Sequence, residues 1–219
     1  MTIILLSPFV AALLLAVIYL MSFAGAAPSW RKTAIKTGAV ACLVPLALMF
    51  HMPGWIVIGL ALGAVGDFAL SRPGQGAFLA GMMAFAAGHL AYLVAFLGLG
   101  AAWPSWSAIA MMVMLAGAVE IWVVPHAGSL RWPVRGYIVV IVAMAIAAMG
   151  LPPEATALSW GVAFFVTSDA ILSVETFVMR EGARKRLASR ALWLFYWSGQ
   201  ALIAIGLALA PLFTAPAMN

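Results

Sequence analysis

The sequence predicts an all-α integral membrane protein, a single domain over residues 1–219 built as a bundle of eight transmembrane helices with both termini periplasmic. Hydrophobic residues make up 66% of the 219 residues and charged residues only 8%, which leaves too little polar surface for a water-soluble domain. The apolar residues also gather in runs of about 20, the length that a helix needs to cross a bilayer. Helices are expected because lipid satisfies no backbone hydrogen bond.

Eight apolar runs follow one another along the chain. Most are separated by short turns that contain helix-interrupting prolines, namely Pro28, Pro53, Pro73, Pro104 and Pro152. The first run lacks a basic leading region and is too long for a signal peptide, so we expect it to persist as a helix. The predicted helices cover, in order, residues 2–24, 33–51, 55–71, 76–98, 105–125, 133–151, 157–179 and 190–212.

Basic side chains predict the orientation of this bundle. With eight helices, all 11 Lys and Arg residues fall on one side, and the other side carries only Glu154. The positive-inside rule makes the basic side cytoplasmic, which predicts a multi-pass protein of a bacterial-type inner (cytoplasmic) membrane. Charges that flank apolar runs set topology, so the net charge of +5 does not indicate nucleic acid as a partner. The basic residues are Arg31, Lys32, Lys36, Arg72, Arg131, Arg135, Arg180, Arg184, Lys185, Arg186 and Arg190.

Residues that build metal or cofactor sites are scarce. Cys42 is the one cysteine and lies in an apolar run, so no disulfide framework is expected. His51, His89 and His126 fall at the outer end, the middle and the inner end of predicted helices, which is unsuited to a three-histidine zinc site. Glycine-rich phosphate loops, H-E-x-x-H and G-x-S-x-G are absent from the sequence. We therefore expect no metal and no cofactor, and chemistry inside the bundle.

Two aspartates lie within apolar runs. An ionised carboxylate at the centre of a spanning helix costs about 2.5–3.5 kcal/mol, so such a residue is a candidate functional residue. Asp67 follows Trp55 by 12 residues and Asp169 follows Ala157 by 12, which places both about 18 Å along parallel helices. If the two helices are neighbours, both carboxyls can face one cavity. The alternative is that each aspartate only holds neighbouring helices together.

Four further polar residues share helix faces in pairs. His89 and Tyr92 are three residues apart, and Tyr196 and Gln200 are four apart, so each pair points to one side of its helix. Either pair alone is typical of packed, hydrogen-bonded side chains. Together with the aspartates they could line one polar pocket as positioning or proton-relay groups.

Two basic residues are candidates for binding or positioning a substrate. Arg135 lies at the depth of Glu120 across a short loop, which favours a structural ion pair. Lys36 is long enough to reach the inner membrane surface, where it could bind a phosphate headgroup.

Several of these stretches, taken in order, carry a resemblance to a known family. They are Gly66-Asp67, Phe78–Tyr92, Tyr137–Met144, the run GVAFFVTSDAIL that holds Asp169, and Tyr196–Ile203. The chain resembles the YhhN family of membrane proteins, whose characterised animal members are lysoplasmalogenases. The resemblance covers roughly the second to the eighth helix. One departure is Lys36-Thr37, where the family often has Lys followed by Pro.

The resemblance implies a membrane-embedded hydrolase that cleaves the vinyl-ether bond of a lysoplasmalogen-type lyso-glycerophospholipid. Its partners would be this substrate, reached from the bilayer, and membrane lipids. Protonation of the vinyl β-carbon gives an oxocarbenium ion, water adds, and the hemiacetal collapses to a fatty aldehyde and a glycerophospho-alcohol. Two buried carboxylates can supply the acid and the base. This makes Asp67 and Asp169 the candidate pair, in an order that the sequence leaves open.

Two alternatives use the same residues. Intramembrane carboxylates also relay protons in transporters, so a proton-coupled transporter of a small molecule or lipid is the main rival. A non-catalytic lipid-binding protein is the third interpretation. The sequence does not distinguish headgroups, chain lengths or oligomeric states.

Overall fold

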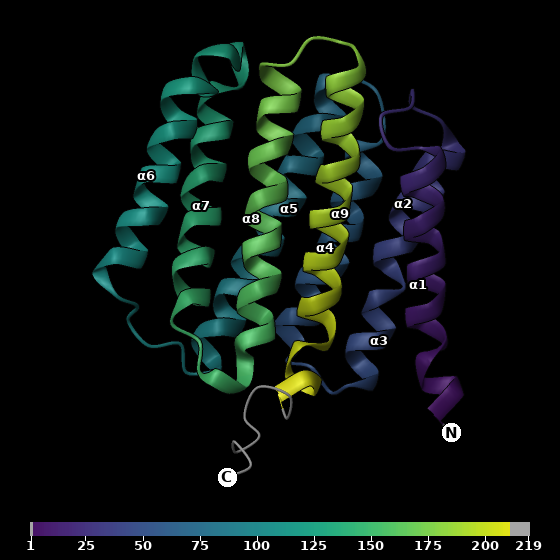
Figure 1. Ribbon diagram of the computed structural model, residues 1–219, viewed down its shortest axis with the longest axis vertical. Coiled ribbons are helices and arrows are strands. Elements are labelled where there is room, and N and C mark those ends of the chain that lie inside the picture. The colour runs from purple at the N-terminus through teal and green to yellow at the C-terminus, as the bar shows by residue number, and fades with distance from the viewer. Residues whose placement is uncertain (1, 211–219) are drawn as a thin grey trace.

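The computed structural model describes residues 2–210, with side chains from Ser7 onward. The described chain is helical throughout and contains no strand. Its helices stand side by side and alternate in direction along the chain, except that α3 continues α2 in the same direction (Figure 1). They are α1 (Thr2–Ser22), α2 (Trp30–Ala41), α3 (Leu43–Met49), α4 (Gly54–Leu70), α5 (Gln75–Gly98), α6 (Trp106–Trp122), α7 (Arg131–Met149), α8 (Thr156–Phe177) and α9 (Ala183–Ile205). Short 3-10 helices cover Val124–His126, Gly128–Leu130, Pro153–Ala155 and Gly206–Leu209.

Six helical stretches of the described chain are long and apolar enough to cross a membrane. Two further apolar stretches are shorter than 18 residues: Gly54–Leu70, which is α4, and Ser7–Ser22, which is the part of α1 described with its side chains. They correspond to the first and third predicted helices, so the count of eight crossings stays a prediction. The six stretches are Trp30–Met49, Gln75–Gly98, Trp106–His126, Gly128–Met149, Pro153–Phe177 and Ala183–Leu209.

The helix predicted over 33–51 begins earlier and is broken. The Ser29 hydroxyl accepts a hydrogen bond from the Lys32 backbone N–H, which caps α2 and starts it at Trp30. Pro45 has no N–H to donate to the carbonyl of Ala41, and the chain divides there into α2 and α3.

The start predicted for the last helix, residue 190, is also wrong. In the structure α9 starts seven residues earlier, at Ala183. Its first turns are basic and lack the apolar signal used to place the boundary. Lys and Arg are good helix formers, and Lys185 pairs with Glu181 four residues earlier at 2.7 Å. The described part of this segment ends at Ala210, so residues 211–212 of the prediction lie outside the described residues.

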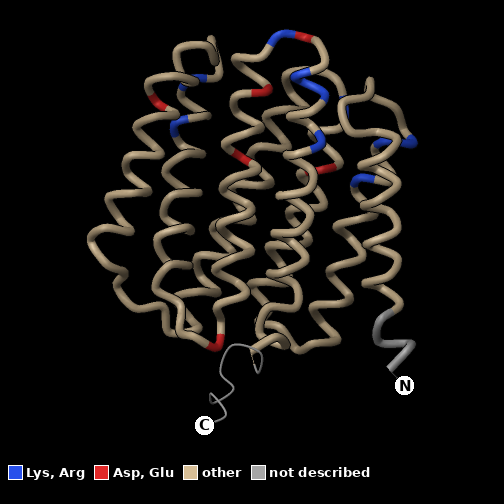
Figure 2. Tube along the Cα trace, in the orientation of Figure 1, with Lys and Arg blue, Asp and Glu red and all other residues tan. Residues whose placement is uncertain are grey.

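Charge is separated along the bundle in the way that the sequence predicted. Figure 2 shows every Lys and Arg of the chain in the upper half of the bundle. The start of α1 and the end of the described chain both lie at the lower end (Figure 1). Glu154 lies in the 3-10 helix Pro153–Ala155, within the connection between α7 and α8 that is also at the lower end (Figure 1).

Glycines let two helix pairs approach closely. A Cβ added at Gly66 of α4 would lie 2.7 Å from the Phe85 ring of α5. A Cβ at Gly199 of α9 would lie 2.7 Å from the carbonyl oxygen of Gly161 on α8. Small residues at such crossings are typical of packed membrane helices. The α4–α5 and α8–α9 pairs therefore form a rigid centre, while α6 packs mainly against α7 and buries only Met112 among its residues.

This packing makes a stability prediction. Gly199→Ala should lower the unfolding free energy by about 1–3 kcal/mol, because its Cβ meets backbone that cannot move aside. Gly136→Ala is the matched control, since nothing lies within 4 Å of a Cβ there. Thermal unfolding of both variants in detergent checks this, and equal behaviour of the two would contradict the close approach of α8 and α9.

Candidate functional site

Asp67 is fully buried and forms an ion pair. The Nζ of Lys36, from α2, lies 2.9 Å from its Oδ1. The hydroxyl of Tyr196, from α9, donates a 2.6 Å hydrogen bond to its Oδ2. The charge that the sequence placed in the membrane is therefore compensated from two neighbouring helices, as a buried charge requires.

The same group continues to a fourth helix. Gln200 Nε2 lies 3.5 Å from the Tyr196 hydroxyl, and the Tyr92 hydroxyl of α5 donates a 2.6 Å hydrogen bond to Gln200 Oε1. Gly63 makes room for this amide, because a Cβ there would lie 2.7 Å from Gln200 Nε2. We call this group the Asp67 cluster; its members are Lys36, Asp67, Tyr92, Tyr196 and Gln200.

Asp169 lies in a separate group with two residues from α7 and α5. The Tyr137 hydroxyl donates a 2.5 Å hydrogen bond to Asp169 Oδ2. His89 Nε2 lies 2.8 Å from the Tyr137 hydroxyl oxygen and 3.4 Å from Asp169 Oδ2. We call these three residues the Asp169 cluster. The Asp169 side chain is 13% exposed, whereas the Asp67 side chain is 0% exposed.

The Asp169 cluster can store and pass a proton. Tyr137 has one hydroxyl proton and donates it toward Asp169, so His89 Nε2 must carry the proton of the His89–Tyr137 bond. His89 Nδ1 is then a bare nitrogen, and it is buried without a hydrogen-bond partner among the described residues. If Nδ1 takes up a proton, the Nε2 proton can pass to Tyr137 and the Tyr137 hydroxyl proton can pass to Asp169. His89 is then neutral and Asp169 is protonated.

The two carboxyls do not share one hydrogen-bonded pocket, contrary to the expectation from the sequence. Phe85 and Phe165 lie between the clusters. Each ring meets the Tyr196 ring edge-on, with centroids 5.7 and 5.3 Å away, and Phe165 also meets the His89 ring at 4.7 Å. The reason is the helix order: α4 packs on α5 and α9, and α8 packs on α7 and α9, so α4 and α8 are not close neighbours.

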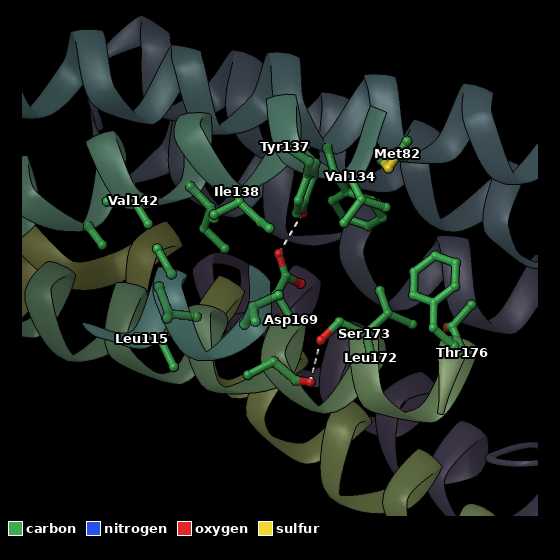
Figure 3. Close-up of a pocket in the computed structure, with 18 of the residues that line it drawn as sticks. Met82, Leu115, Val134, Tyr137, Ile138, Val142, Asp169, Leu172, Ser173 and Thr176 are labelled. Atoms are coloured by element: carbon green, nitrogen blue, oxygen red, sulfur yellow. Dashed lines mark hydrogen bonds between the residues drawn. The ribbon is translucent and has the colours of Figure 1, made fainter. Parts of the chain in front are cut away.

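Asp169, unlike Asp67, lines the apolar cavity of the described bundle. An apolar cavity with an empty volume of about 840 Å³ lies between α5, α6, α7 and α8, and Asp169 lines it (Figure 3). Asp169 is the one carboxylic acid among the described lining residues, and Asp67 is not among them. The lining residues include Met82, Leu115, Val134, Tyr137, Ile138, Val142, Leu172, Ser173 and Thr176.

Some predicted site residues lie elsewhere or divide between the clusters. Arg135 pairs with Glu120 through a 2.6 Å hydrogen bond from Nη2 to Oε1. Both residues are partly buried. Arg135 belongs to neither cluster, and the expected structural ion pair is present. His89 and Tyr92 join different clusters despite sharing a helix. Lys36, expected to reach a headgroup, is paired with Asp67.

Reasoning from the sequence missed Tyr137, which bridges Asp169 and His89. One signal was present: the chain has only four tyrosines, and Tyr137 lies in an otherwise apolar stretch of α7. Its partner could not be deduced, because periodicity does not say which helices are neighbours. No group of three or more His, Cys, Asp or Glu side chains in the described chain could hold a metal ion.

A comparison with known families identifies the protein. The family model described as the YhhN family matches residues 31–207, a range that contains both clusters. The chain belongs to the YhhN family. The resemblance found in the sequence is thereby confirmed, and the six apolar helices identify a multi-pass membrane protein.

Relatives within this family carry a common name. The chain is 33% identical over 181 residues to a Mycobacterium tuberculosis protein named Lysoplasmalogenase, covering 77% of this chain and 67% of the relative. It is 28% identical over 211 residues to Lysoplasmalogenase TMEM86A of Bos taurus, covering 86% and 83%. It is 32% identical over 158 residues to Lysoplasmalogenase TMEM86B of Rattus norvegicus, covering 69% and 64%. No solved structure matches the chain significantly.

The Asp67–Lys36 pair makes a second stability prediction. Asp67→Asn or Lys36→Met alone should each cost about 3–5 kcal/mol, because each leaves one buried charge without its partner. The double variant should lose much less than the sum, since neither charge remains. Unfolding in detergent with increasing dodecyl sulfate measures the four members of the cycle. Additive losses would show that the two groups do not interact.

Proposed function

We propose that this protein is a membrane-embedded lysoplasmalogenase, which hydrolyses the vinyl-ether bond of a lyso-glycerophospholipid to a fatty aldehyde and a glycerophospho-alcohol. The observation that carries the proposal is Asp169, a hydrogen-bonded carboxylic acid on the wall of an apolar cavity. An alkenyl chain can lie in such a cavity with its ether bond against the acid. The names of the family relatives support the same reaction.

The proposed membrane topology has eight crossings, with both termini periplasmic and the basic end in the cytoplasm of a bacterial-type cell. It is supported by the segregation of all 11 Lys and Arg residues at one end of the bundle. It is also supported by the two shorter apolar helices, which stand parallel to the longer ones (Figure 1).

In the proposed mechanism Asp169 is the catalytic residue that protonates the vinyl β-carbon. The O–H bond of the acid breaks, a C–H bond forms, and the ether oxygen stabilises the resulting oxocarbenium ion. The Asp169 carboxylate then faces this cation and stabilises it in an apolar site, where charge interactions are strong. Water adds to the α-carbon and Asp169 takes the proton that the water releases. Collapse of the hemiacetal expels the glycerol oxygen, which gains the hydroxyl proton.

Tyr137 and His89 are positioning residues in this mechanism. Tyr137 fixes the carboxyl. The hydrogen bond between His89 and Tyr137, followed by the one from Tyr137 to Asp169, supplies a route for protonation of Asp169. General acid catalysis by a positioned group contributes about 100- to 10,000-fold to the rate. One carboxyl can act first as acid and then as base, so the cycle does not need Asp67 to touch the substrate.

Asp67 acts in this proposal through the helices that it joins. Its contacts with Lys36 and Tyr196 tie α4 to α2 and α9. The Tyr196 ring packs on Phe165, which packs on His89. The Asp67 cluster therefore supports the wall against which the Asp169 cluster is built.

Asp169→Asn should reduce hydrolysis at least about 100-fold while the protein stays folded, because the amide cannot donate the proton. Ser173→Ala is the control: Ser173 lines the same cavity, and its hydroxyl bonds only the carbonyl of Ala170 among the described partners. Aldehyde release from a lysoplasmalogen by purified protein is the measurement. Full activity of Asp169→Asn would overturn the mechanism, and uptake into proteoliposomes without hydrolysis would favour a transporter.

The product aldehyde formed in heavy water should carry one deuterium at C2, the former vinyl β-carbon. The proposed first step transfers a solvent-derived proton to that carbon. Mass spectrometry of the aldehyde, trapped at once as an oxime to prevent exchange, makes the measurement. Aldehyde without deuterium would exclude protonation of the β-carbon.

A further inference from the structure

A second cavity opens at the basic end of the bundle. It has an empty volume of about 1260 Å³ and lies between the α1–α2 loop, α2, the end of α8 and the start of α9. Its wall carries four cations and two carboxylates, unlike the apolar cavity beside it. The charged lining residues are Lys32, Lys36, Glu175, Glu181, Lys185 and Arg186.

Two of these cations are not used in ion pairs. Lys36 is paired with Asp67, and Lys185 with Glu181. The ion pairs of the described residues include neither Lys32 nor Arg186. Lys32 Nζ is held in place by a 2.5 Å hydrogen bond to the carbonyl of Ala26, in the α1–α2 loop. An ammonium and a guanidinium thus line one cavity with donors left for an anion.

The two cavities adjoin. Four residues line both of them: Leu70, Phe78, Leu172 and Thr176. The apolar cavity suits a hydrocarbon chain and the charged cavity a polar headgroup. A single-chain lipid has both parts, joined in that order.

The spacing of the two sites fits a glycerophospholipid. Glu175 lines the charged cavity and lies six residues after Asp169 on α8, about 9 Å along the helix axis. In a lysoplasmalogen, seven bonds separate the phosphorus from the vinyl β-carbon. At the reach of an extended chain, about 1.2 Å per bond, they span about 8 Å. A phosphate at the level of Glu175 would therefore lie about as far from Asp169 along α8 as the phosphorus lies from the β-carbon.

We propose that the charged cavity binds the phosphate of the lyso-glycerophospholipid headgroup, with Lys32 and Arg186 as its partners. This inference rests on the proposed hydrolase function and adds the site that selects and aligns the substrate. The phosphate contacts set the distance from the headgroup to Asp169, so the substrate is recognised by its charge and by the length of its glycerol link.

The test compares two vinyl-ether substrates, a lysoplasmalogen and the corresponding 1-alkenyl glycerol without phosphate. Lys32→Gln/Arg186→Gln should raise KM for the lysoplasmalogen at least tenfold with little change in kcat, and leave the kinetics of the alkenyl glycerol unchanged. Arg184→Gln/Arg190→Gln is the control, because it also removes two positive charges, from the part of α9 that holds Arg186, and neither residue lines the cavity. Equal losses on both substrates, or losses in the control, would overturn the inference.

Binding without hydrolysis separates this inference from the proposed function. A 1-alkyl lysophospholipid has no vinyl ether to cleave and should raise the unfolding temperature of the wild type more than that of Lys32→Gln/Arg186→Gln. That result would stand even if the wild type cleaved no vinyl ether. Inorganic phosphate is the second probe. Equal stabilisation by millimolar phosphate and by the lipid would mean a free-phosphate site and would contradict a headgroup site.

Discussion

The cost of burying charge in a membrane is the constraint on which this structure depends. Asp67 is completely buried, and it persists because Lys36 and Tyr196 reach it from two other helices. Those contacts require α2, α4 and α9 to meet at one depth, and the glycines of α4 allow α5 to approach as well. A requirement of local electrostatics therefore fixes the arrangement of four helices.

The two aspartates have different surroundings, and we propose different roles for them on that ground. Asp67 is fully buried among charged and polar partners and is not among the lining residues of either cavity. Asp169 is held by one tyrosine, which is linked to a histidine with a free buried nitrogen, and it faces an apolar cavity. An acid that must give its proton to carbon needs a substrate-facing position and few competing charges. Asp169 meets both conditions, which is why we propose it for the chemistry and propose that Asp67 supports the bundle.

Much of the fold follows from the sequence, because apolar length and basic side chains report directly on membrane segments and their ends. The intramembrane positions of Asp67 and Asp169 follow for the same reason. The sequence did not predict the break beside Pro45 or the early start of α9. Hydropathy takes no account of hydrogen bonding, and it gives a low score to helical turns that are basic. The separation of the clusters by Phe85 and Phe165, and the bridge made by Tyr137, depend on which helices touch. That information arises from side-chain packing between distant segments and is not contained in the periodicity of any one helix.

The most direct test of this division of roles is kcat for lysoplasmalogen hydrolysis by the folded double variant Asp67→Asn/Lys36→Met, measured beside Asp169→Asn. If Asp67 only supports the bundle, the double variant keeps kcat within about tenfold of the wild type, while Asp169→Asn loses at least about 100-fold. A folded double variant as inactive as Asp169→Asn would contradict the account and make Asp67 a partner in the chemistry.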